Sequence, residues 1–176
     1  AVILLDKGQD AKAALDEADT KAAEALSKDS NDPTAQEIQA VALFRRAEIE
    51  ERGGKDPRPF LDRAITALDR LASDSKDIPA LMNRGRALLK RARAEAAKGA
   101  DPRNFYDRAS KDFDAARGND APGGGTIEPI LGSATARVEK AIEDSKKGTD
   151  ASQVFQKVID EMTAGLQPSD LIVVAG

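Results

Sequence analysis

An internal repeat constrains this chain more than any other feature of its sequence. Residues 56–64 read DPRPFLDRA, and residues 101–109, which lie 45 positions later, read DPRNFYDRA. The likeness continues upstream of this motif. The further matching positions are Leu43/Leu88, Arg46/Arg91, Ala47/Ala92, Glu50/Glu95 and Gly54/Gly99. A fixed period of this size predicts stacked units that share one extended core, so we expect function to lie on an extended surface.

Two fainter copies flank the clear ones. The downstream copy is marked by Gly148, Asp150, Phe155 and Val158, and the upstream copy by Gly8, Asp10, Leu15, Asp16 and Ala18. We therefore interpret 1–176 as a single repeat domain. Its expected parts are a truncated first unit at 1–31, full units at 32–77 and 78–122, a degenerate unit at 123–168, and a tail or the start of a further unit at 169–176. Because the sequence begins part-way through a unit and ends on an apolar run, we expect it to be an excerpt from a longer array.

Turn and capping residues divide each unit into two helices. Gly54, Gly99 and Gly148 suit a left-handed helix end, and an Asp follows each of them to cap the next helix. Apolar residues between these signals recur with the 3.6-residue period of a helix. We expect an all-α fold of about seven antiparallel helices, without a β-strand. The expected helices are 10–29, 33–53, 57–74, 78–98, 102–117, 126–147 and 150–165.

The composition removes most classes of enzyme. The 176 residues include no Cys and no His, so thiolate nucleophiles, zinc-thiolate sites and the commonest general base are absent. We expect no catalytic residue, no cofactor and no metal. A net charge of −4 and only 3% aromatic residues disfavour nucleic acid, and no apolar run approaches the roughly 18 residues of a membrane span. The compartment stays open, with the cytoplasm slightly favoured over the periplasm.

Two short patterns invite a chemical interpretation, and we give each a plain one. The glycine run at 123–125 lacks the Gly-Lys-Ser/Thr ending of a phosphate-binding loop, so we interpret it as a flexible loop. Asp112 and Asp114 stand two residues apart in an expected helix and face different directions. We therefore expect a solvated helix face there and not a pair of metal ligands.

One unit carries a motif that resembles the tetratricopeptide repeat. The residues that carry the likeness are Leu81, Asn83, Arg84, Gly85, Leu88, Tyr106, Ala109, Phe113 and Pro122. The preceding unit departs from the motif, with Ala40 in place of the Gly and Leu68 in place of the Phe. The resemblance implies a right-handed solenoid of helical hairpins, a tetratricopeptide-like superhelix whose concave groove binds protein segments.

The length of the unit departs from that family. The 45-residue period exceeds the family's usual 34. Elongated units with a Gly-x-Asp-Pro turn are similar to arrays found with bacterial serine/threonine kinases. A helical pair of this length also suits HEAT-type repeats.

The first helix of each hairpin lines the concave face in the family that this chain resembles. We therefore expect the peptide-binding groove to lie among positions of these helices that differ between units. The expected groove residues are Glu37, Val41, Arg45 and Glu48, then Met82, Asn83, Arg86, Lys90 and Arg93, then Leu131, Thr135, Glu139 and Ile142.

The segment 78–100 is locally basic. It holds six basic side chains and one acid, Glu95, inside a chain of net charge −4. One interpretation is a site for an acidic or phosphorylated peptide or a C-terminal carboxylate, with Arg86 and Arg93 as bidentate donors. The alternatives are an ordinary solvated face and pairing with the acidic first helix of a neighbouring chain.

Three functions remain open from the sequence. The first is a non-enzymatic protein-protein interaction scaffold that binds a peptide or protein segment in its concave groove. The second is a regulatory or docking segment of a larger enzyme such as a bacterial serine/threonine kinase. The third is a structural array that assembles with copies of itself through its ends.

Overall fold

The computed structural model describes residues 11–73, 77–118 and 127–164, and over these residues the chain is all-helical, with seven helices and no strand. The helices are α2 (Lys12–Lys28), α3 (Pro33–Arg52), α4 (Arg58–Leu71), α5 (Ile78–Ala96), α6 (Arg103–Gly118), α7 (Ile127–Ser145) and α8 (Ser152–Ala164). Their ends differ from the expected ones by a few residues at most, so the predicted helices are confirmed. The expected features at 1–10, the glycine loop at 123–125 and the tail at 169–176 lie outside the described residues.

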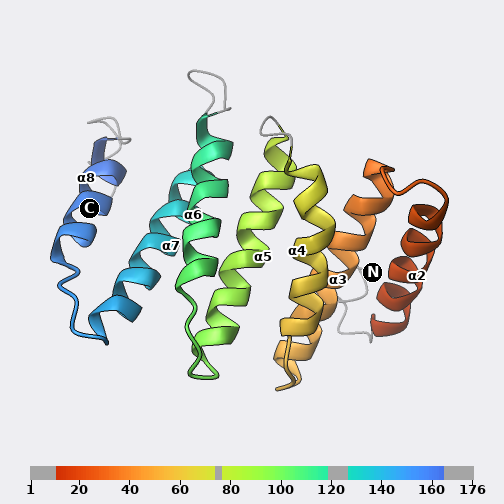
Figure 1. The fold of residues 1–176 in the computed structure, drawn as a ribbon, viewed down its shortest axis with the longest axis horizontal. Coiled ribbons are helices and arrows are strands. Elements are labelled where there is room, and N and C mark those ends of the chain that lie inside the picture. Colours follow the sequence, from red (N-terminus) through yellow and green to blue (C-terminus); the bar gives the residue numbers. More distant parts are fainter. Residues whose placement is uncertain (1–10, 74–76, 119–126, 165–176) are drawn as a thin grey trace, which may run out of the picture.

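The helices stand in a row that follows chain order, with α2 and α8 at opposite ends (Figure 1). Consecutive helices run in opposite directions, and each packs against the helices before and after it. The connections α3–α4, α5–α6 and α7–α8 all lie along the same side of the row, at the bottom of Figure 1. Each of these three pairs therefore forms a hairpin, and α2 precedes the first of them.

The three hairpin turns share one geometry. Gly54, Gly99 and Gly148 have φ of 70°, 74° and 88°, a left-handed conformation that residues with a Cβ rarely adopt. In each turn the backbone N–H after the glycine donates back to a carbonyl in the last turn of the helix, which satisfies a group that the helix itself leaves unpaired. These bonds join Lys55 to Glu50 (2.8 Å), Ala100 to Glu95 (3.2 Å) and Thr149 to Asp144 (3.1 Å).

An aspartate starts the second helix of each hairpin. Asp56 accepts a hydrogen bond from the backbone N–H of Arg58 at 3.0 Å, and Asp101 accepts one from Arg103 at 3.2 Å. The two arginine side chains also donate to these carboxylates. The side-chain and backbone bonds from Arg58 lower the pKa of Asp56 to about 2. The Asp-Pro-Arg motif thus caps the helix through both the backbone and the side chain of its arginine.

The core is built around Phe113, whose side chain is 2% exposed. A Cβ on Gly85 would come within 2.9 Å of its ring, and one on Gly132 within 2.7 Å. The ring therefore fills the space that two glycines leave, one on α5 and one on α7. In the preceding hairpin, the corresponding residues Ala40 and Leu68 are both buried. There Ala replaces Gly85 and adds a Cβ, and Leu replaces Phe113 and is smaller than the ring.

Candidate functional site

A groove of about 540 Å³ lies between α3 and α5. Its apolar lining comes from Ala40, Val41, Phe44, Leu68 and Leu89. Polar and charged side chains complete the lining, namely Arg45, Glu48, Asn83, Arg86, Lys90, Arg93 and Glu128. The groove therefore combines an aliphatic and aromatic surface with hydrogen-bonding groups, a composition typical of ligand sites.

Seven of the residues expected in the groove line it. They are Val41, Arg45, Glu48, Asn83, Arg86, Lys90 and Arg93. Glu37 lies outside it, in an adjoining cavity of about 320 Å³ that Asn83 also lines. On α7, Leu131 and Ile142 are exposed and Thr135 is half-buried, and these three do not line the groove. Glu139 approaches it through an ion pair with Arg93.

The expectation for Met82 was wrong. Its side chain is 7% exposed and belongs to the main hydrophobic core, because this part of α5 faces its neighbouring helices. Sequence reasoning also missed Phe44 and Leu89, which provide much of the apolar lining. These two residues stand one 45-residue repeat apart, and this recurrence of a large apolar side chain was the available signal.

The local excess of basic charge is offset by acids of neighbouring helices. Arg86 pairs with Glu128 of α7, and Arg93 pairs with Glu139 of α7 at 2.6 Å. Lys90 pairs with Glu51 of α3 at 2.5 Å. The cations of the groove are therefore paired with carboxylates of α3 and α7. Because these side chains are partly exposed, each ion pair contributes only about 0–1 kcal/mol to stability.

The expectation of a solvated face at Asp112 was also wrong. Asp112 is 6% exposed and accepts two hydrogen bonds from Arg84, at 2.7 and 2.8 Å. Arg84 also reaches Asp69 of α4 at 3.1 Å. A carboxylate at this depth needs such a partner, because an unpaired buried charge is costly. Asp114 instead bonds Ser133 and Arg137 of α7.

The repeated sequence motif holds adjacent hairpins together. At each junction, the helix that ends one unit makes two ion pairs with the helix that starts the next. The first set of pairs is Asp16–Arg46 (2.8 Å), Asp62–Arg91 (2.6 Å) and Asp107–Lys140 (2.6 Å). The second set is Lys12–Glu50 (3.2 Å), Arg58–Glu95 (3.5 Å) and Arg103–Asp144 (3.5 Å). Most of the recurring charged residues thus serve the junctions and not a ligand.

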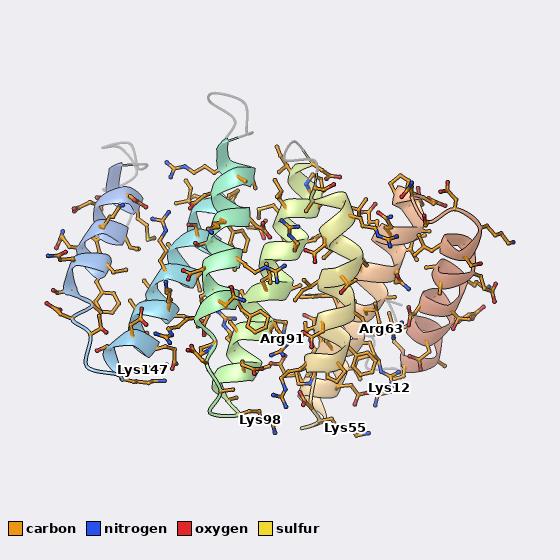
Figure 2. The ribbon with its side chains drawn as sticks, in the orientation of Figure 1. Lys12, Lys55, Arg63, Arg91, Lys98 and Lys147 are labelled. Carbon is orange, nitrogen blue, oxygen red and sulfur yellow. The ribbon has the colours of Figure 1, made fainter. Side chains whose placement is uncertain are left out.

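The aromatic residue of the motif serves the same contacts. Arg46 lies over the ring of Phe60 at 5.3 Å, and Arg91 lies over the ring of Phe105 at 4.6 Å. Figure 2 shows Lys55, Lys98 and Lys147 along the side of the row that carries the hairpin turns. The recurring Gly-x-Asp turns lie on that side, whereas the groove is lined mainly by residues that differ between units.

The described residues include no group of three or more acidic, His or Cys side chains placed to hold a metal ion. Burial, together with the negative charge of Glu139, raises the pKa of Tyr106 well above its ordinary value. No helix in the described ranges has the length and apolar character needed to cross a membrane. Comparisons with protein-family models, with curated proteins and with solved structures gave no match to this chain.

Proposed function

We propose that this chain is a right-handed helical-repeat solenoid, similar to tetratricopeptide repeats, that acts as a non-enzymatic scaffold and holds a segment of a partner protein in the groove between α3 and α5. The groove itself carries this proposal. Its volume of about 540 Å³ suits several side chains of a bound segment. Val41, Phe44 and Leu89 offer apolar contact, and Asn83 and Arg45 offer hydrogen bonds.

The exposed ion pairs in the groove favour a partner with acidic residues among its apolar ones. Arg86 and Arg93 are each about half exposed, so a carboxylate from outside can replace Glu128 or Glu139 at little cost. The apolar lining supplies affinity, and the exchange of carboxylates supplies selectivity.

Selection of peptides from a random displayed library on the immobilised protein tests this function. Val41 is exposed, so Val41→Asp places a charge in the groove without disturbing the core. We expect the selected peptides to carry aliphatic residues and to bind Val41→Asp about tenfold more weakly, because an apolar contact is replaced by a charged one. Gln153→Asp on α8 adds the same charge far from the groove and is the matched control. Equal binding to all three proteins would place the contact elsewhere.

Self-assembly is a second candidate, because exposed apolar side chains gather on α7 and α8. Ile127, Leu131 and Ile159 are 45–60% exposed. Light scattering over a concentration series tests this candidate. A mass that rises with concentration, and falls back in an Ile159→Lys variant, would support it, and a constant monomer mass would exclude it.

A further inference from the structure

A second cavity, of about 580 Å³, lies between α2 and α4 with α3 beneath it. Leu26 and Ser27 of α2 line one side, and Arg63, Ala67 and Arg70 of α4 line the other. Gln36, Gln39 and Leu43 of α3 form the base. We call this cavity the α2–α4 crevice. It is as large as the groove, and it lies between the helices that end their units.

At the corresponding places further along the row, an arginine side chain lies between two carboxylates. Between α4 and α6, the guanidinium of Arg84 is held by Asp112 and Asp69, and Asp69 also accepts from Arg108 at 3.3 Å. Between α6 and α8, Arg137 is held by Asp114 and Glu161, and the cavity left there is only about 10 Å³. In both places, two carboxylates hold one arginine side chain.

The α2–α4 crevice repeats part of this cluster and lacks the rest. Asp19 accepts from Gln39 at 3.0 Å and from Arg63 at 2.7 Å, as Asp69 accepts from Arg84 and Arg108 in the next unit. Ala67 stands where that unit has Asp112, and Gln39 stands where it has Arg84. The crevice therefore lacks the carboxylate and the guanidinium that meet at the corresponding positions of the next unit.

The lining that remains is rich in hydrogen-bond donors. Arg70 donates one nitrogen to the carbonyl of Ser30 at 2.8 Å and pairs with no carboxylate among the described residues. Within the described part of the chain, the guanidinium of Arg63 donates through Nη2 alone, to Asp19. Each guanidinium carries five N–H groups, so most of these donors stay available. Asp62, the acid in the lining, is already paired with Arg91.

We propose that the α2–α4 crevice is a second binding site, which takes an acidic side chain of a partner protein. The carboxylate lies over Ala67, in the place that Asp112 holds in the next unit, and receives hydrogen bonds from Arg63 and Arg70. These two arginines stand one helical turn to either side of Ala67. An aliphatic neighbour of the acid packs against Leu26, which is half-buried on α2. This site is separate from the groove and does not depend on the function proposed for it.

Fluorescence anisotropy with two peptides tests the site. The probe is a fluorescein-labelled peptide of four Leu-Glu-Glu triplets, and its control has Leu-Gln-Gln triplets. Ala67→Asp supplies the missing carboxylate from the chain itself, and Arg70→Gln removes an exposed cation without adding bulk. We expect each variant to bind the acidic probe about tenfold more weakly than the native protein, which is the loss of one charge-assisted hydrogen bond. We expect Gln153→Asp, which adds a charge on α8 outside both cavities, to bind it like the native protein.

Several outcomes would overturn the proposal. One is equal affinity of the native protein for both peptides, and another is no binding of the acidic probe. A third is binding that Val41→Asp weakens while Ala67→Asp and Arg70→Gln leave it unchanged. That last result would place the acidic segment in the groove and would support the function proposed there. Circular dichroism checks that Ala67→Asp folds. If this variant does not fold, the affinity of Arg70→Gln for the acidic probe tests the proposal by itself.

Discussion

The hairpin α3–α4 and the hairpin α5–α6 have similar turns, caps and junction contacts. Among the positions at which they differ, two pairs have the clearest structural consequences. The first pair is Ala40 with Leu68 in one hairpin, and Gly85 with Phe113 in the other. The second is Gln39 with Ala67 in one, and Arg84 with Asp112 in the other. In the first pair, Leu68 packs in a hairpin that has Ala40, and the larger Phe113 ring uses the space that Gly85 leaves. The second places the open α2–α4 crevice beside one hairpin and the buried Arg84–Asp112 ion pair inside the other. Recurring residues therefore set the backbone, and the residues that vary decide where the surface is open.

The largest effect that tests this comparison is on the core. Phe113→Ala removes a ring that contacts α5 and α7 as well as its own helix, so we expect unfolding to become easier by about 3–5 kcal/mol. Leu68→Ala in the other hairpin removes a smaller side chain and should cost less. Urea denaturation of both variants measures the two losses. A larger loss for Leu68→Ala would contradict the central place given to Phe113.

The next effect is on the buried ion pair. Asp112→Ala leaves Arg84 with only Asp69, which is about half exposed, so we expect a loss of about 2 kcal/mol. Asp69→Ala is the matched control and should cost less, because Arg84 then keeps its buried partner. The same denaturation assay compares them. Equal stability of native protein and Asp112→Ala would show that the pair contributes nothing.

A third test exchanges the core pairs between the hairpins. Gly85→Ala places a Cβ within 2.9 Å of the Phe113 ring, so we expect a loss of about 1–3 kcal/mol. Adding Phe113→Leu recreates the Ala and Leu pair of the preceding hairpin, and the Ala then costs less than it does beside Phe. A double-mutant cycle measures this coupling. Strictly additive losses would mean that the two positions do not compensate each other.

The smallest effect concerns the caps that both hairpins share. Arg58 lowers the pKa of Asp56 from 3.8 to about 2, so Asp56 contributes stability above about pH 4 that is lost as the pH falls towards 2. Arg103 lowers the pKa of Asp101 in the same way, and Lys147 donates a further hydrogen bond to this carboxylate. The stability that Asp101 contributes is therefore lost at a lower pH than that of Asp56. Melting temperatures between pH 5 and 2 should therefore converge for native protein and Asp56→Asn. Parallel curves would contradict this assignment, and Asp160→Asn on α8 is the control.

The helices and turns were predictable because their signals are local. Gly99 and Asp101 act on their own turn, and the sequence displays both. The surroundings of a helix face were less predictable, because they depend on neighbouring helices. Met82 and Asp112 were misplaced for this reason. The charge of segment 78–100 was counted correctly, yet Glu51 and Glu128, which offset it, lie on other helices about 40 residues away in the sequence.

The packing of each helix on its neighbours in chain order also bears on how the chain acquires its fold. Such contacts close short loops, so little chain entropy is lost before they begin to stabilise the structure, and we expect rapid folding. Adjacent hairpins offer several starting points from which order can spread in both directions along the row. A defect at one junction then delays the segment beyond it and leaves the remaining helices able to assemble.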